Sequence, residues 1–517
     1  MKILLLEHPR SFTVERCNDI ANTPLSSCLI TGYTAGILKR KGHDVEIVEG
    51  YLDRLSYDEI GRRISAMRPD ILGAHLVYHW EHDHDLFSFL ERIKKEAAAP
   101  RITAYGFYAT IAFADILKSC SAVDSVIVGE AEIPFADLAD AVSAGTQGVT
   151  IPGLAVRDGT GGVTHRKGKT VRDPDSLPFP VRTDAMYRLP EVNILGSRGC
   201  YGQCSFCYIN SFYGRGEPWR GRSPENIVEE IDGIIAERGT KDFYFTDPNF
   251  FGPGRRGQER ALRLSSLLKP RGIRFGIEAR VNDIHEETIG ALVDAGLRHI
   301  LIGLESGKDE SLRRMNKMTT VAQNEKALRL LRKYGVEPNV GFIMFEPDST
   351  PEDISTNLEF LKRNNLLKHL PVTANVLYHH QIVLEGTEAY HTLMSEGRLA
   401  VCASSYEGVA SFKDPGVAGL AGIMREVTKF LFTRMEGIWS GRTMEPPGAK
   451  PRYTKVNQLL IEVFEENLKS LESGGRVDDG RTAILFRRIE AEIDGIVKPT
   501  QRQTIKNGNG PQQREKV

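Results

Sequence analysis

The sequence lacks features that mark several broad classes of protein. Its 67 lysines and arginines nearly cancel its 68 aspartates and glutamates, so no overall field attracts nucleic acid or an anionic membrane. No apolar run approaches the roughly 20 residues that cross a bilayer. The apolar part of Met1–Glu7 is too short for a signal peptide, and a charged residue follows it too early. We therefore expect a soluble, cytoplasmic enzyme with no membrane or nucleic-acid partner.

Cysteine is also scarce, with seven residues in 517. An odd number with three clustered does not suit a disulfide framework and favours a reducing compartment. The cluster is Cys200, Cys204 and Cys207, whose thiols at i, i+4 and i+7 of a loop can converge. Soft thiolates select zinc or iron–sulfur clusters, and three ligands leave one metal of a four-metal cluster open. A structural zinc site normally has four protein ligands, and no second Cys or His pair follows, so the iron–sulfur cluster is favoured over zinc.

Residues 1–144 alternate short apolar runs with amphipathic stretches. This alternation predicts a parallel, doubly wound α/β domain whose ligands bind at the carboxyl ends of the strands. No Gly-x-Gly-x-x-Gly follows the first run, so we do not expect a dinucleotide site. The predicted strands are Ile3–Leu6, Val45–Val48, Ile71–Ala74, Ile102–Tyr105 and Ser125–Val128.

A second stretch, residues 191–399, repeats the alternation of short apolar runs and amphipathic stretches six times. It predicts a partial (β/α)6 barrel with functional residues where strands end. Residues 145–190 are predicted to be a linker with a small hairpin near Gly159. Residues 400–499 have helical patterns, and the polar tail 500–517 should be disordered. The predicted barrel strands are Asn193–Gly196, Phe243–Thr246, Arg274–Ala279, His299–Leu304, Asn339–Met344 and Val372–Leu377.

The spacing Cys-x3-Cys-x-Phe-Cys resembles the signature of the radical S-adenosylmethionine (SAM) enzymes. The resemblance implies a [4Fe–4S] cluster on the three cysteines, SAM on the open iron, and Phe206 against the adenine. It also implies that Asp247 holds the SAM amino group, Arg280 pairs with the SAM carboxylate and Glu305 binds the ribose hydroxyls or the amino group. A guanidinium suits planar, bidentate recognition of a carboxylate.

The first domain resembles the B12-binding-type domain that is fused to many radical SAM enzymes. Pro24-Leu25, the stretch Lys41–Val45 and the stretch Val128–Glu132 fit that pattern. Ala74-His75 stands where the family commonly has a small hydroxyl residue, and Tyr105-Gly106 where it commonly has Gly-Gly. Those small residues make room for the nucleotide tail of the cofactor. The resemblance thus implies cobalamin, with an empty or repurposed pocket as the alternative.

Four further residues are candidates for contact with the substrate. Tyr213 follows the cysteine loop closely, and His379 and His380 lie beside the sixth predicted strand, where alternation allows at most one to point inward. Cys402 could donate a hydrogen atom, although a buried inert thiol is the commoner role. For Tyr213, a role in packing is as strong an alternative as contact with the substrate.

The stretch Tyr78–Asp85 holds three histidines and three carboxylates and so suggests a metal site. It also lies at a predicted strand-to-helix turn, where polar and acidic residues are ordinary. We favour the structural turn.

Together these features predict a radical SAM enzyme. It would cleave SAM reductively and abstract hydrogen from an unactivated carbon of a small, natural-product-type molecule, as in antibiotic biosynthesis, with flavodoxin or ferredoxin as electron donor.

The first prediction for the outcome is cobalamin-dependent C-methylation. The alternative is cobalamin-free dehydration or epimerisation of an aminoglycoside-like sugar, as in the family member that removes the 3′-hydroxyl of paromamine. A tRNA methylthiotransferase would need a second cluster on cysteines such as Cys17, Cys28 and Cys120, whose contexts do not match. A non-enzymatic cluster or zinc carrier is the remaining alternative.

Overall fold

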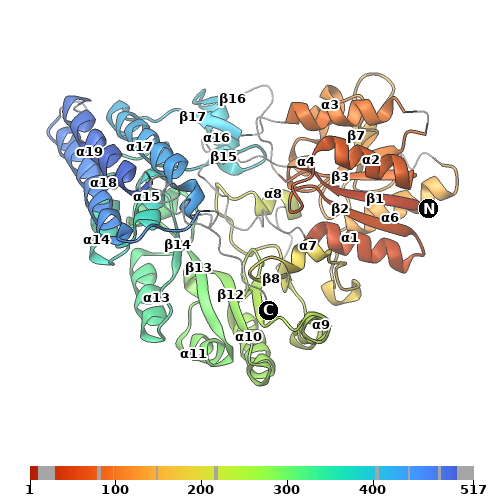
Figure 1. Cartoon of the computed structure of the whole chain (residues 1–517), viewed down its shortest axis with the longest axis horizontal. Helices are drawn as coiled ribbons and strands as arrows, with labels where there is room; N and C mark the ends of the chain where they lie inside the picture. The colour runs from red at the N-terminus through yellow and green to blue at the C-terminus, as the bar shows by residue number, and fades with distance from the viewer. Residues whose placement is uncertain are drawn as a thin grey trace, which may run out of the picture.

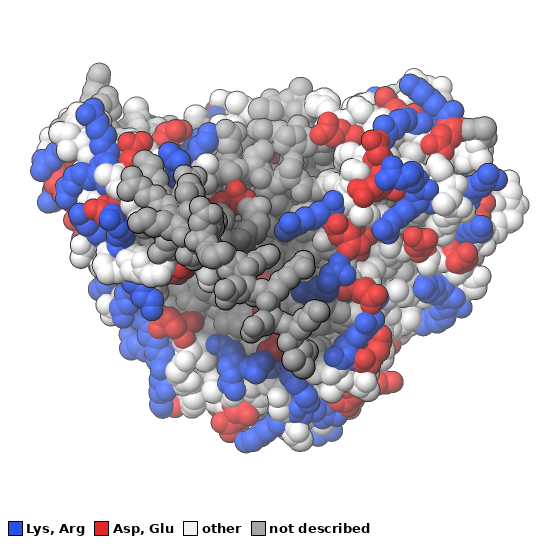
Figure 2. All heavy atoms as spheres, in the orientation of Figure 1, with Lys and Arg blue, Asp and Glu red and all other residues white. Residues whose placement is uncertain are grey.

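The computed structural model describes residues 1–9, 29–77, 83–96, 98–146, 150–214, 219–401, 407–439, 443–474 and 479–497. Three parts lie beside one another: an N-terminal sheet domain, a central sheet with flanking helices, and a C-terminal group of helices on the far side of the central sheet (Figure 1). Lysines and arginines are interspersed with aspartates and glutamates on the face in Figure 2. No helix in the described ranges is long and apolar enough to cross a membrane.

The N-terminal sheet has the strand order β2-β1-β3-β4-β5-β6-β7. Strands β1 to β5 are parallel and confirm the five predicted strands, whereas β6 and β7 form an antiparallel hairpin on β5. The predicted linker hairpin therefore extends this sheet. The strand order reverses between β1 and β3, which is where doubly wound domains bind ligands. The bounds are β1 (Lys2–Glu7), β2 (Asp44–Glu49), β3 (Ile71–His75), β4 (Arg101–Tyr105), β5 (Ser125–Ile127), β6 (Leu154–Arg157) and β7 (Val163–His165).

Helices cover both faces of this sheet because successive strand side chains point to opposite sides. Ile3 and Leu5 pack in one core with α1 and α6, and Leu4 and Leu6 pack in the other with α2 and α3. The helices are α1 (Leu29–Arg40), α2 (Tyr57–Met67), α3 (Asp83–Lys94), α4 (Phe107–Ile111), α5 (Phe113–Ser119) and α6 (Glu132–Ser143).

The central sheet is wholly parallel, in the order β14-β13-β12-β11-β8. Its first long helix begins as predicted, with the Ser223 hydroxyl accepting the Asn226 N–H and Pro224 at the first turn. The strands are β8 (Val192–Ile194), β11 (Asp242–Phe245), β12 (Arg274–Arg280), β13 (Leu297–Glu305) and β14 (Asn339–Phe342). The helices are α9 (Pro224–Arg238), α10 (Gly254–Leu268), α11 (Glu286–Ala295), α12 (Asp309–Arg314), α13 (Val321–Lys333) and α14 (Pro351–Arg363).

Short elements complete this part of the chain. The antiparallel pair β9 and β10 and the helix α8 flank the cysteine loop. The bounds are α7 (Asp184–Tyr187), β9 (Ser197–Arg198), α8 (Ile209–Tyr213) and β10 (Arg220–Gly221), with 3₁₀ turns at Pro174–Ser176, Lys269–Arg271 and Val281–Asp283.

The sixth barrel strand is the one element that was predicted wrongly. Val372–Leu377 lies within a helix, α15 (Leu370–Tyr378), with Pro371 in its first turn. Its apolar residues pack against α17 and α18, and a short, continuously apolar run is compatible with a buried helix as well as with a strand. In the described ranges the sheet thus has five strands, and a single parallel bridge between Phe345 and His380 continues it.

The C-terminal part is mainly helical, as predicted. Its long helices share one continuous core with the central sheet and its helices, so they close that side of the sheet. A small antiparallel sheet in the order β15-β17-β16 lies beside them. The bounds are β15 (Val383–Leu384), α16 (Glu388–Ser395), β16 (Leu399–Val401), β17 (Glu407–Ala410), α17 (Pro415–Trp439), α18 (Ala449–Glu472) and α19 (Asp479–Val497). The predicted tail lies outside the described residues.

Candidate active site

The three clustered cysteines lie on the loop between β9 and α8, and all three line one cavity. Cys204 is buried and the other two are partly buried. The Gly202 N–H donates to Cys200 Sγ at 3.3 Å. Burial, reinforced by the sulfur of Cys204, raises the pKa of the Cys207 thiol to about 12. Such crowded, buried thiols suit a cationic centre that stabilises their thiolate forms.

The number of thiols bears on the choice between zinc and a cluster. Three thiols line the cavity, which is the number of ligands that leaves one iron of a [4Fe–4S] cluster open. A structural zinc site normally takes four protein ligands. The three thiols of the cavity wall therefore fit the cluster better than structural zinc.

Segments distant in the sequence hold the cysteine loop in place. The Ser205 N–H donates to the Met315 carbonyl at 2.9 Å, and the Asn316 side chain donates to the Gln203 carbonyl at 2.7 Å. The Ala389 N–H donates to the Ser205 carbonyl at 2.9 Å. The loop is therefore held from both the segment after α12 and the start of α16.

Arg280 ends β12 and lies directly against the cysteine loop. Its Nη1 donates to Cys204 Sγ at 3.4 Å and its Nη2 donates to the Lys317 carbonyl. Gly202 permits this approach, because a Cβ there would lie 2.2 Å from Nη1. Arg280 Nε is buried and has no hydrogen-bond partner among the described residues. The predicted SAM-binding arginine thus lines the cavity and retains one unused donor.

Glu305 and Lys317 form a buried ion pair in the cavity wall, with Lys317 Nζ 2.7 Å from Glu305 Oε1. Glu305 has a φ of 62° at the end of β13, and Asn316 and Met318, which flank Lys317, also have positive φ. Such strain in non-glycine residues concentrates at functional sites. Lys317 was not predicted from the sequence, because a lone lysine well beyond a strand end gives no periodic signal.

Phe206, the residue predicted to lie against adenine, also lines the cavity. Its ring packs against a small cluster formed by Leu312, Met315 and Ile343. The side chain is therefore held by the segment that also anchors the cysteine loop.

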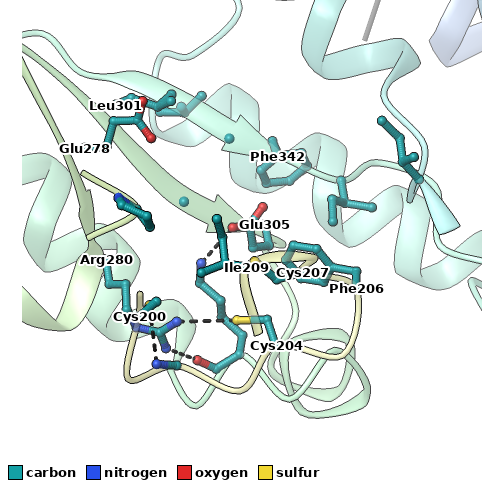
Figure 3. A pocket seen from close by; sticks show the side chains of 18 of the residues that line it. Cys200, Cys204, Phe206, Cys207, Ile209, Glu278, Arg280, Leu301, Glu305 and Phe342 are labelled. Atoms are coloured by element: carbon teal, nitrogen blue, oxygen red, sulfur yellow. Dashed lines mark hydrogen bonds and ion pairs between the residues drawn. The ribbon is translucent and has the colours of Figure 1, made fainter. Parts of the chain in front are cut away.

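The opposite end of the cavity is formed by Glu278 and Leu301 (Figure 3). The Tyr244 hydroxyl donates to Glu278 Oε1 at 3.0 Å. Burial, with a smaller contribution from Asp247, raises the pKa of Glu278 to about 8. Sequence analysis missed Glu278 because it lies inside a strand rather than after it.

Helix α15 supplies another wall through Asn375, and His379, the C-cap residue that follows the helix, also lines the cavity. Burial lowers the pKa of His379 to about 4, so the imidazole is neutral near pH 7. The whole cavity measures about 340 Å³, within the usual range for small-molecule sites. Of the substrate-contact candidates that the structure describes, His379 is the one that lines it.

The remaining predicted site residues that the structure describes do not line this cavity. Asp247 is completely buried, and Tyr213 is buried with its ring against the Arg220 guanidinium. His380 forms the bridge that continues the central sheet. Cys402 lies outside the described residues, as do Cys17, Cys28 and residues 78–82 of the histidine-rich stretch.

Buried charges join the N-terminal domain to the start of the cysteine loop. Arg198 donates to Glu130 at 2.7 Å, and Arg220 donates to the same carboxylate at 2.9 Å. Nearby, the Phe107 ring lies edge-on to Tyr208, with the ring centroids 5.1 Å apart. The first domain thus supports the loop that carries the thiols.

The carboxyl edge of the N-terminal sheet has a different character. Glu7 at the end of β1 accepts hydrogen bonds from Thr31 at 2.5 Å and pairs with His75 at 2.9 Å. The Tyr105 hydroxyl donates to Thr31 at 2.7 Å. All four residues are at most 2% exposed. A Cβ at Gly106 would lie 2.6 Å from the His75 ring. At the switch point between β1 and β3, these residues fill the space between the sheet and α1.

The comparisons with known proteins agree with the cysteine signature. Residues 194–361 match the radical SAM superfamily. An uncharacterized methyltransferase of Pyrococcus horikoshii is 27% identical over 375 residues, which cover 70% of this chain and 78% of that protein. The anaerobic magnesium-protoporphyrin IX monomethyl ester cyclase of Cereibacter sphaeroides is 27% identical over 62% of this chain, but only 54% of the cyclase is matched.

Among solved structures, the cobalamin-dependent S-adenosylmethionine radical enzyme OxsB, with aqua-cobalamin bound, matches 98% of this chain and 81% of its own. The TM-score is 0.78 at 18% sequence identity. At that identity the similarity concerns the fold, which the two chains share over nearly the whole length of this one.

Proposed function

We propose that this chain, which is a radical SAM enzyme, abstracts a hydrogen atom from an unactivated carbon of a small molecule bound in the cavity. The observation that carries the proposal is that all three thiols, Arg280 and Glu305 line one cavity. When bound, a [4Fe–4S] cluster with SAM on its open iron supplies the electron and the radical precursor for this step. A flavodoxin or ferredoxin would reduce the cluster.

The residues of this chain hold and orient these groups. Cys200, Cys204 and Cys207 are the cluster ligands, and Arg280 Nη1 donates a hydrogen bond to Cys204 Sγ. Phe206 would lie against the adenine ring. The unused Nε of Arg280 suits the SAM carboxylate, because a guanidinium binds a carboxylate through two donors. Glu305, fixed by Lys317, would accept from the ribose hydroxyls or the amino group.

Anaerobic reconstitution tests this function. With iron, sulfide, SAM and a reductant, the chain should hold about four irons and four sulfides and release 5′-deoxyadenosine and methionine. A preparation that contains one zinc and no acid-labile sulfide would contradict the proposal. The same measurement separates the enzyme from a zinc or cluster carrier.

The names of the relatives favour C-methylation as the outcome, since the Pyrococcus horikoshii protein is called a methyltransferase. The fold shared with OxsB raises the question whether cobalamin takes part. The described residues do not fit a corrinoid whose nucleotide tail is inserted between the sheet and α1. That space is filled by Tyr105 and Thr31, and the sheet edge is closed by the Glu7–His75 pair.

This filled space favours a second candidate function, cobalamin-free dehydration or epimerisation of a sugar-like substrate. Hydroxocobalamin added during reconstitution and followed through gel filtration separates the two candidates. A stoichiometric corrinoid spectrum that co-elutes with the protein would support methyl transfer. Its absence, with formation of 5′-deoxyadenosine intact, would support the cobalamin-free reaction.

A further inference from the structure

Glu278 carries a polar atom that the structure leaves without a partner. The side chain projects from β12 into the cavity wall, and only 6% of the residue is exposed. Oε1 accepts from Tyr244, whereas Oε2 is buried and has no hydrogen-bond partner among the described residues. A buried polar group left unpaired costs about 1–3 kcal/mol. A ligand that reaches Oε2 would recover this free energy.

The surroundings of Glu278 set the kind of partner it can take. Leu301 lines the same end of the cavity and offers no charge (Figure 3). The titratable groups that face Glu278 are Tyr244, which donates to it, and Asp247, which disfavours a second negative charge. Burial in this setting keeps the carboxyl protonated at neutral pH. Oε2 then carries a hydrogen and is an unpaired donor in the cavity wall.

We propose that Glu278 binds an acceptor oxygen of the substrate, such as a carbonyl, ether or hydroxyl oxygen, through its Oε2–H. The apolar residues around it would contact the adjoining carbon skeleton. Because Glu278 lies at the end of the cavity away from the thiols (Figure 3), this subsite is distinct from the SAM end. The inference rests on the proposed function only in taking this cavity as the substrate site.

Matched small probes test the subsite without knowledge of the substrate. The cluster-loaded, SAM-bound and unreduced enzyme is titrated with cyclohexanone, protonated cyclohexylamine or methylcyclohexane, and binding is measured by ligand-observed NMR. Cyclohexanone should bind more tightly than methylcyclohexane and cyclohexylamine. Its affinity should fall as the pH rises through about 8, because an ionised Glu278 donates no hydrogen bond.

Two substitutions separate the hydrogen bond from general packing. Glu278→Leu should weaken cyclohexanone binding about tenfold. Glu278→Gln keeps a donor at the same place, so it should bind within about twofold of the wild type and lose the pH dependence. Glu7→Gln is the matched control, since it changes a buried carboxyl group outside the cavity and should leave cyclohexanone binding as in the wild type.

Several outcomes would overturn the inference. These are equal binding of cyclohexanone and methylcyclohexane, tighter binding of the amine, or no loss in Glu278→Leu. Iron content and 5′-deoxyadenosine formation are measured on the same preparations. Failure of those two measurements would contradict the proposed function, whereas failure of the probe titration alone would contradict the subsite.

Discussion

The chain builds two parallel sheets whose carboxyl edges differ in how their polar groups are satisfied. At the edge of the N-terminal sheet, Glu7, Thr31, His75 and Tyr105 bond to one another and are buried. At the edge of the central sheet a cavity of about 340 Å³ remains. Among its lining residues, Arg280 Nε and Glu278 Oε2 have no partner among the described residues.

Both edges are positions where α/β folds bind ligands, so the fold alone does not distinguish them. The difference lies in residue size and pairing. Tyr105 fills the space beside α1, whereas Gly202 and Gly303 keep side chains out of the cavity. Unpaired buried polar groups cost free energy, so those on residues that line an open cavity are candidates for completion by a ligand. The closed hydrogen-bond network thus argues against a ligand site at the edge of the N-terminal sheet. The open cavity with unpaired polar groups argues for one at the edge of the central sheet.

The largest effect is expected at the cysteine loop. Cys204→Ala removes one cluster ligand, so iron and sulfide content should fall and 5′-deoxyadenosine formation should drop by roughly a thousandfold or more, because the cofactor carries the chemistry. Cys120→Ala is the control, since Cys120 is buried in the N-terminal core. Equal iron content in the two variants would argue against the cysteine assignment.

A smaller effect is expected at Arg280. Arg280→Lys retains the charge but loses the planar fork, so SAM binding should weaken about tenfold to a hundredfold, measured by equilibrium dialysis on cluster-loaded protein. Arg274→Lys is the control on the same strand, where an exposed arginine pairs with Asp242. An exposed pair contributes about 1 kcal/mol or less. Unchanged SAM affinity in Arg280→Lys would remove Arg280 from the proposed SAM site.

The closed edge should respond in stability and leave the chemistry unchanged. Tyr105→Phe deletes the donor to Thr31, so the free energy of unfolding should fall by about 1–3 kcal/mol. Formation of 5′-deoxyadenosine by the folded protein should stay at the wild-type level. Denaturant unfolding and the cleavage assay measure the two effects. A loss of cleavage without a loss of stability would place a function at this edge.

The sequence predicted those features that are local in the chain. The strands of both sheets, the cap at Ser223 and the cysteine loop each follow from a short pattern. The closed N-terminal edge also has a local signal, because His75 and Tyr105 stand where smaller residues would leave space. These predictions needed no knowledge of which segments meet.

Features that depend on contacts between distant segments were missed. Lys317 and Glu278 enter the cavity because of where the chain folds, and no spacing in the sequence indicates it. Asp247 follows a strand as predicted, but one residue of register decides which side a side chain faces. Asp247 is fully buried and does not line the cavity. Helix α15 was mistaken for a strand because a continuous apolar run has no period.

The smallest expected effect concerns Glu278 and stability. Burial raises the pKa of Glu278 to about 8 in the folded state from an ordinary value of 4.5. Between these values the folded chain binds more protons than the unfolded chain, so this group makes stability fall as the pH rises. Glu278→Gln does not titrate, so its thermal midpoint relative to the wild type should rise by roughly a few degrees from about pH 5 to about pH 8. Glu229→Gln, at an exposed site on α9, is the control and should show no such trend.

A pH-independent difference for Glu278→Gln would mean that the carboxyl is ionised in the fold. The cavity would then present a negative charge to its ligand. Only the thiols and Arg280 would then distinguish the open edge of the central sheet from the closed edge of the N-terminal sheet.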